Sequence, residues 1–197
     1  SMLKRIFPDK NIDVTLDPTL MVDASVWNHL EKKIPLPDKY VLIFSLNGYE
    51  KTYATAEEIA AKRGIPIIEV LGHNIDFLDK RKHRKLATLG PQEFLYAIHH
   101  ADAVVTDSFH GTAFSIIYQR DLRVIPHKTR GARMVELLQA INAENRLVGD
   151  HTRIIHEKIE WNEESLRLLE ALKAHSFEFI TNAVNSIAFN KGACKDK

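Results

Sequence analysis

The 197-residue sequence has a single cysteine, no long apolar run and almost no excess charge. Cys194 has no internal partner for a disulfide, which agrees with a reducing compartment, and we expect a cytoplasmic protein. No apolar stretch reaches the length that crosses a bilayer, so we expect no transmembrane segment, and no signal peptide is visible. Lysine and arginine total 27 against 26 acidic residues, and this balance predicts no polyanion partner.

Several binding motifs are also missing. The sequence has neither a P-loop nor a G-x-G-x-x-G turn, so a bound nucleotide cofactor has no support. His99, His100, His151 and His156 lack the spacing of a convergent metal site, and we expect no metal. Residues 80–85 form a basic run without interleaved aromatic side chains. A solvated loop, or a surface that meets another domain, is therefore a better interpretation than nucleic-acid binding.

What is present is an alternation of short apolar runs and helical patterns. Tyr40 to Leu46 is the strongest strand, a helix from about Lys51 to Arg63 is closed by Gly64, and Ile67 to Leu71 is the next strand. Further strands are expected at 103–106 and 122–126. This pattern predicts right-handed βαβ units, and hence a Rossmann-like three-layer α/β domain with a mainly parallel sheet.

The other segments complete the domain. Ser1-Met2 resembles a tag remnant before a start codon, and residues 1–16 are expected to be a linker or an incoming strand, with a short strand around 12–16. Residues 17–197 form the Rossmann-like domain. Within it we expect helices at 25–31, from Pro91, from about Gly131, and at 163–187 with Asn162 as its cap, and one more short strand at 154–155.

The turn from Asp107 to Gly111 is the first candidate site, because it joins a buried strand to a helix. Free backbone amides and the helix dipole favour an anion there. Asp107 or Ser108 can cap the helix, and Gly111 leaves room for a ligand. His110 stands in the first helical turn, where a bound anion would favour its charged form, so it is a candidate general acid. The alternative is an ordinary cap, with His110 only satisfying a hydrogen bond.

Two neighbouring loops reach the same edge of the sheet. The loop from Ser45 to Lys51 could contact a substrate through Asn47 or Tyr49, although a plain connection is the simpler interpretation. The second loop carries cations at positions 128, 130 and 133. Cations are disfavoured at the start of a helix, so an anionic ligand explains them better than solubility does.

Three stretches of the sequence resemble the polysaccharide pyruvyl transferase family. The central stretch combines a G-P-Q-E-F-L helix start at 90–95 with A-D-A-V-V-T-D-S-F-H-G-T-A-F-S at 101–115. The D-P-T-L sequence at 17–20 is similar to the opening of the family's second domain. Residues 130–146 are similar to the R-x-x-x-L-L…R pattern with which the family's second domain ends. The resemblance covers most of the chain from about 17 to 146.

The resemblance implies the carboxyl-terminal half of a GT-B-type bacterial enzyme, whose amino-terminal partner domain is missing here. Such enzymes transfer enolpyruvyl from phosphoenolpyruvate to a sugar diol in exopolysaccharide or capsule biosynthesis, with a sugar or lipid-linked oligosaccharide as acceptor and no bound cofactor. His110 falls on the proton donor of the family. The substrate-binding residues expected with it are Ser108, Phe109, Gly111, Thr112, Lys128, Arg130 and Arg133. A GT-B nucleotide-sugar glycosyltransferase and a non-catalytic binding domain remain as alternatives.

Overall fold

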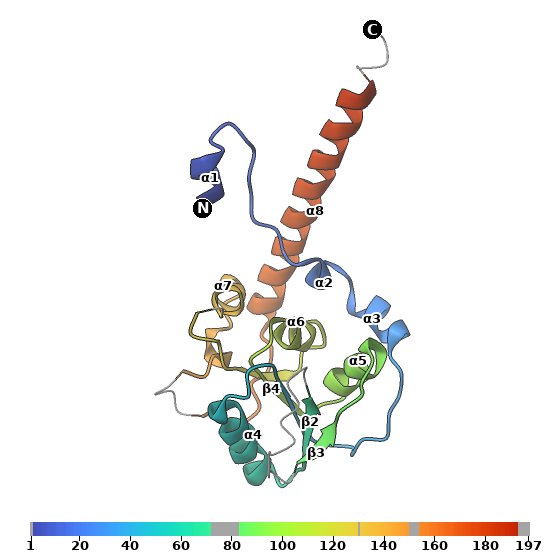
Figure 1. Cartoon of the computed structure of the whole chain (residues 1–197), viewed down its shortest axis with the longest axis vertical. Coiled ribbons are helices and arrows are strands. Elements are labelled where there is room, and N and C mark those ends of the chain that lie inside the picture. Colours follow the sequence, from blue (N-terminus) through green and yellow to red (C-terminus); the bar gives the residue numbers. More distant parts are fainter. Residues whose placement is uncertain (1, 72–82, 130, 150–153, 193–197) are drawn as a thin grey trace.

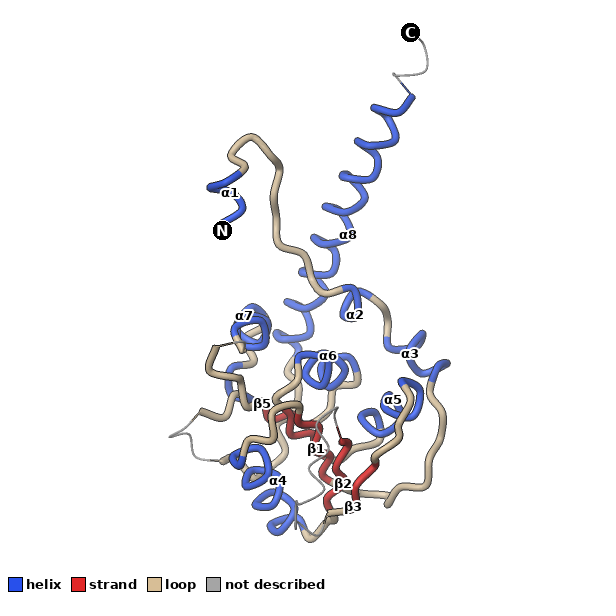
Figure 2. The backbone as a smooth tube through the Cα atoms, in the orientation of Figure 1, coloured by secondary structure: helices blue, strands red, loops and turns tan. Residues whose placement is uncertain are grey.

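A five-stranded parallel sheet forms the centre of the protein. The computed structural model describes residues 2–71, 83–129, 131–149 and 154–192 (Figure 1). The strands are β1 Val41–Ser45, β2 Ile67–Leu71, β3 Arg84–Leu86, β4 Ala103–Thr106 and β5 Asp121–Val124, in the order β3-β2-β1-β4-β5 (Figure 2). The order reverses between β1 and β4, and in open α/β sheets such a switch point opens a crevice at the carboxyl ends of the strands.

Helices cover both faces of the sheet. Helix α4, Glu50–Arg63, covers one face, where it packs on Val41 and Ile43 of β1. Helices α5, Pro91–His99, and α6, Phe109–Ile117, cover the other face, where Leu42 of β1 lies in the larger apolar cluster. Alternate residues of one strand therefore enter two cores, which explains why β1 is apolar at successive positions. The predicted three-layer α/β architecture is confirmed.

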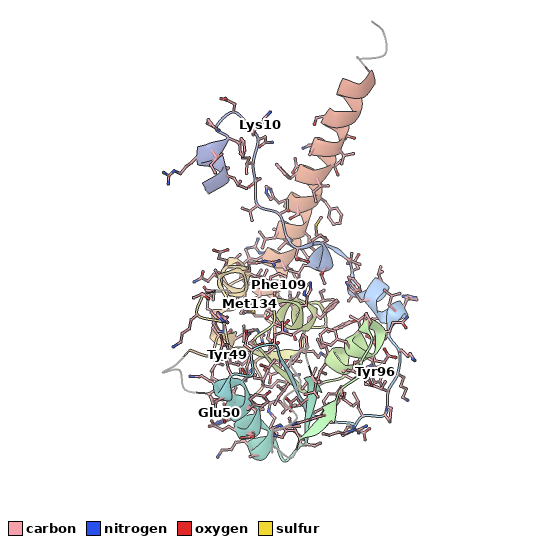
Figure 3. The ribbon with its side chains drawn as sticks, viewed as in Figure 1. Lys10, Tyr49, Glu50, Tyr96, Phe109 and Met134 are labelled. Atoms are coloured by element: carbon pink, nitrogen blue, oxygen red, sulfur yellow. The ribbon has the colours of Figure 1, made fainter. Side chains whose placement is uncertain are left out.

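The remaining helices surround this core. They are α1 Met2–Ile6, α2 Pro18–Met21, α3 Ala24–Leu30, α7 Ala132–Ala140, a 3₁₀ turn at Glu144–Arg146, and α8 Glu163–Gly192. Side chains crowd between the sheet and its helices, with Phe109 and Met134 in the α6–α7 region (Figure 3). Helix α8 packs through its first half and then projects away from the domain. None of the helices in the described segments combines the length and apolar character needed to cross a membrane.

Local sequence signals account for several element ends. Gly64 ends α4 with φ of 64°, in the left-handed region that glycine adopts without strain. The Asn162 side chain accepts a hydrogen bond of 2.7 Å from the Ser165 amide at the start of α8, and the predicted cap is confirmed. Pro91 opens α5, where its missing N–H costs nothing.

Two predicted strands are wrong. Residues 12–16 form no strand, because their extended backbone joins no sheet and instead contacts α8, where the Leu16 amide donates to Ser176 Oγ at 2.9 Å. Residues 154–155 form none either, because the Ile155 carbonyl accepts from the buried Arg123 guanidinium at 2.7 Å. Strand β3 was not predicted. The first half of the basic run, residues 80–82, lies outside the described residues, and β3 begins in its second half.

Arg146 holds the segment that leads into α8. Its guanidinium donates to the carbonyls of Ile159 and Glu160 at 3.1 and 3.0 Å and lies 3.6 Å from the centre of the Trp161 ring. Burial lowers the pKa of Arg146 to about 10, because the charged form loses hydration. These contacts with two carbonyls and an aromatic ring give Arg146 a structural role.

Candidate functional site

A cavity of about 660 Å³ opens at the carboxyl ends of β1, β2 and β4. This volume lies in the range of small-molecule sites. Its walls are mainly apolar, with Phe44, Leu46, Val70, Leu71, Ala87, Leu89, Gly90, Pro91, Phe94 and Phe114, and its polar side chains are Ser108 and His110. No lysine or arginine belongs to the described lining. The predicted turn at the end of β4 therefore does border a pocket, at the switch point of the sheet.

The buried carboxylate of Asp107 ties the two loops of the switch point together. Its oxygens accept hydrogen bonds from the Ser45 hydroxyl at 2.7 Å, the Leu46 amide at 2.7 Å and the Asn47 amide at 3.2 Å. Ser45 Oγ in turn accepts from the Gly48 amide at 3.0 Å. Asp107 thus fixes the loop after β1 against the turn after β4, and it leaves the cap position to Ser108.

The start of α6 is built around Thr106 and Ser108. The Thr106 hydroxyl donates to the Phe44 carbonyl at 2.6 Å and accepts from the Ser108 amide at 3.0 Å. The Ser108 hydroxyl caps the helix by accepting from the Gly111 amide at 3.4 Å. A Cβ at Gly111 would lie 2.4 Å from Thr106 Oγ1. Close packing on Thr106 therefore requires glycine at position 111, and the approach of a ligand to Gly111 stays a prediction.

His110 is exposed at the first turn of α6, and its side chain lines the 660 Å³ cavity. The first amides of a helix lack intrahelical partners, and among the described residues those of Phe109 and His110 have no other acceptor. Thr112, by contrast, is fully buried and donates its hydroxyl to the Ser108 carbonyl at 2.9 Å. The structure thus brings His110, Ser108 and two helix amides together, and it places Thr112 inside the core.

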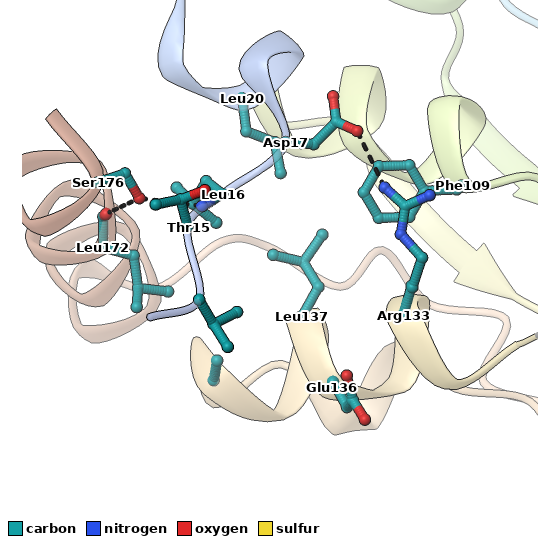
Figure 4. Close-up of a pocket in the computed structure, with 12 residues that line it drawn as sticks. Thr15, Leu16, Asp17, Leu20, Phe109, Arg133, Glu136, Leu137, Leu172 and Ser176 are labelled. Atoms are coloured by element: carbon teal, nitrogen blue, oxygen red, sulfur yellow. Dashed lines mark hydrogen bonds and ion pairs between the residues drawn. The ribbon is translucent and has the colours of Figure 1, made fainter. Parts of the chain in front are cut away.

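Arg133 lies on the other side of the α6 start, in a smaller cavity of about 280 Å³ (Figure 4). Its guanidinium pairs with Asp17 at 2.9 Å and stands over the Phe109 ring, 3.9 Å from the ring centre. Phe109 lines this second cavity, whereas His110 lines the first. The amino end of α6 therefore separates the imidazole from the guanidinium.

Asp17 links these two side chains electrostatically. Burial raises the pKa of its carboxyl, but hydrogen bonds from Thr19 and Arg133, together with the nearby His110, outweigh burial and lower the pKa below its usual 3.8. The Asp17 side chain also caps α2 by accepting from the Thr19 amide at 3.1 Å. Asp17 is ionised at neutral pH and holds Arg133 beside the helix start.

The remaining predicted substrate contacts belong to the loops after β1 and β5. Lys128 is exposed after β5, and Arg130 lies outside the described residues. The Tyr49 ring lies 5.6 Å from the His127 ring, between centres, so this loop contacts the loop after β5.

Two acidic residues of this region were not predicted to have these roles. Asp107 was considered only as a cap, and Asp17 only as part of a motif, although each pairs with residues far away in the sequence. The proline after Asp17 is a local signal for the start of α2 with Asp17 as its cap, although this cap was not predicted. Nothing local in the sequence indicated its pairing with Arg133.

Comparison with known protein families gives a match over much of the chain. The family model described as polysaccharide pyruvyl transferase matches residues 1–129, a range that contains all five strands of the described sheet, the His110 turn and Asp17. A search of curated proteins finds no match.

Proposed function

Because this match spans well over half of its length, the chain belongs to the polysaccharide pyruvyl transferase family, and we propose that it binds phosphoenolpyruvate as the donor of the transferred group. The observation that carries the proposal is the exposed imidazole of His110 beside unpaired helix amides, at the mouth of a mainly apolar cavity. A compact anion with a reactive methylene group suits this combination of a positive helix end and apolar walls.

The anionic groups of the donor would lie at the start of α6. The amides of Phe109 and His110 supply hydrogen-bond donors, and the helix dipole adds a positive potential. Arg133 lies across the α6 start from His110, but its guanidinium rests on the Phe109 ring and is 64% exposed, so it would reach an anion at this helix end by leaving Asp17. An exposed ion pair such as Arg133–Asp17 contributes only about 0–1 kcal/mol, so an incoming phosphate can compete for the arginine. The positive charges of Lys128 and Arg130 would balance the remaining negative charge of the donor.

His110 would act as the general acid. It donates a proton to the methylene carbon of phosphoenolpyruvate, while a sugar hydroxyl oxygen attacks the neighbouring carbon and the double bond between them becomes single. A second hydroxyl oxygen then attacks the same carbon, the carbon–oxygen bond to phosphate breaks, and inorganic phosphate leaves. The proton from one hydroxyl restores His110, and the other leaves with phosphate. The product is a pyruvate ketal.

The acceptor sugar would enter the cavity at the carboxyl ends of the strands. The cavity there is bordered by the loops after β1 and β4, which Asp107 holds rigidly together. We propose that a second domain faces this edge and supplies the remaining acceptor contacts, as ligands of GT-B-type enzymes lie between two domains.

Amide NMR tests the donor site directly. Titration of the ¹⁵N-labelled chain with phosphoenolpyruvate should shift the amides of Phe109, His110 and Gly111 in a saturable way. A parallel titration with uridine diphosphate tests the glycosyltransferase alternative. Shifts confined to residues away from the start of α6, or saturation by the nucleotide and not by phosphoenolpyruvate, would overturn the proposal.

A further inference from the structure

One carboxylate and two imidazoles meet where α3 and α5 end, outside the candidate donor site. His99 Nδ1 lies 2.6 Å from Glu31 Oε1, and His100 Nε2 lies 3.4 Å from Glu31 Oε2. All three ligand atoms lie within 4.8 Å of one another. Tetrahedral zinc holds its ligand atoms about 3.3 Å apart, so shifts on the order of 1 Å would bring this set into coordination.

The electrostatic setting of the cluster favours a cation. Glu31 is the carboxyl-terminal cap of α3, and His100 is that of α5, so the negative ends of two helix dipoles converge on one carboxylate. The neighbouring cation Lys32 does not neutralise this charge, because its ammonium group binds Glu93 at 2.7 Å. Neutral imidazoles leave the carboxylate charge in place. A bound divalent ion would offset it.

A buried hydroxyl beside the cluster gives a second, independent indication. The Tyr118 ring stacks on the His99 ring with centres 4.3 Å apart and planes 11° apart. Tyr118 is only 4% exposed, and burial together with the nearby Glu31 carboxylate raises the pKa of its hydroxyl. That hydroxyl has no partner at hydrogen-bond geometry in the described structure. A hydroxyl in this position would orient a metal-bound carboxylate, which is the usual outer-shell arrangement.

We propose that Glu31, His99 and His100 bind one divalent transition-metal ion, of the zinc class, with water completing the coordination. Two imidazole nitrogens select such ions over magnesium and calcium, which prefer oxygen ligands. The side chains of His99 and His100 are 29% and 46% exposed, so the ion and a water molecule can reach them. The sequence prediction of no metal had considered the two histidines without Glu31, which lies 68 residues from His99.

The ion would fasten the connection before β1 to α5. Gly90 and Pro91, at the opposite end of α5, line the His110 cavity. The helix has nine residues and is about 13 Å long, so the metal lies away from the reacting groups and acts by holding one wall of the cavity in place.

Calorimetric titration with Zn²⁺ tests the site in the whole chain carrying Cys194→Ser, so that the thiol does not compete. We expect saturable one-to-one binding. Glu31→Gln and His100→Ala should each weaken it at least tenfold, and Tyr118→Phe about tenfold. His175→Ala is the matched control, because His175 is an exposed histidine that also pairs with a carboxylate, Asp13 at 3.0 Å, and it should leave the affinity unchanged.

Visible absorption of the Co²⁺-loaded chain gives a second readout that depends on the ligands. The partly exposed His100 makes His100→Ala the variant least damaging to the fold, and far-ultraviolet circular dichroism of the metal-free chain checks that it folds. Absence of saturable Zn²⁺ binding, or equal affinity in wild type, Glu31→Gln and His100→Ala, would show that the cluster is only an ion pair.

Discussion

Among single residues, Gly111 constrains the start of α6 most tightly. A methyl group there would lie 2.4 Å from Thr106 Oγ1, which cannot withdraw because it bonds both the Phe44 carbonyl and the Ser108 amide. We expect Gly111→Ala to destabilise the protein by about 1–3 kcal/mol, since overpacking outweighs the gain of at most about 1 kcal/mol in helix propensity. Urea unfolding measures this difference.

The control for Gly111 is a double-mutant cycle with Thr106→Ala. This background removes the hydroxyl that the new methyl group would meet, so Gly111→Ala should cost less there than in the wild type. An equal cost in both backgrounds would contradict the packing explanation.

Asp107 gives a prediction about the connection between two elements. Its three accepted hydrogen bonds join the loop after β1 to the turn after β4. Asp107→Asn places an amide N–H₂ group opposite some of these donors, and we expect a loss of about 2 kcal/mol in the free energy of unfolding. Asp38→Asn, at an exposed position, should change it by less than about 0.5 kcal/mol. Similar losses in both variants would argue against a special role for Asp107.

The start of α5 gives a pH-dependent prediction. The hydrogen bond and charge of Lys32 lower the pKa of the Glu93 carboxyl below its usual 4.5. A lowered acid pKa means that the pair stabilises the fold above about pH 4.5, and that this contribution is lost as the pH falls through the folded-state pKa. We expect Lys32→Met to raise the Glu93 pKa toward 4.5 in an NMR titration. Lys33→Met should leave it unchanged, and an unaltered Glu93 titration in Lys32→Met would contradict the pairing.

The sequence predicted the elements that depend on local pattern. The strands β1, β2 and β4 are mainly apolar runs, and β5 continues into the apolar residues Val124 and Ile125. Helices α4 and α6 carry their own end signals, so a few neighbouring residues are enough to predict each of these elements. Strand β3 was missed because Arg84 and Lys85 are charged. It lies at the edge of the sheet, where it pairs with β2 on one side. The false strand at 154–155 had the right composition, but a buried guanidinium takes up its Ile155 carbonyl.

The candidate site also has features that the local sequence predicts and features that depend on distant residues. The exposure of His110 and its position at the helix start follow from the strand–turn–helix pattern, so the sequence could place it at the ligand edge. The pairing of Arg133 with Asp17 joins positions 116 residues apart, and no local signal records it. The sequence therefore located the cavity edge but not the distribution of charge around it.

For the molecule as a whole, α8 divides into a packed half and an exposed half. Leu169 is buried in the main core, whereas Phe177, Ile180 and Val184 are 52%, 41% and 58% exposed. Changing these three residues to serine should alter the free energy of unfolding by no more than about 0.5 kcal/mol per position, while Leu169→Ala should cost about 2–5 kcal/mol. Thermal unfolding measures both, and a large loss in the triple variant would show that the exposed stripe is packed in the isolated chain.

The central claim is that His110 and the start of α6 form a site for phosphoenolpyruvate. Isothermal calorimetry compares the affinity of the wild-type chain for phosphoenolpyruvate with that of His110→Ala and of the surface control His175→Ala. We predict saturable binding by the wild type and the control, and at least tenfold weaker binding by His110→Ala, since the imidazole lines the cavity beside the helix amides. Equal affinity in all three chains, or no saturable binding by the wild type, would contradict the account.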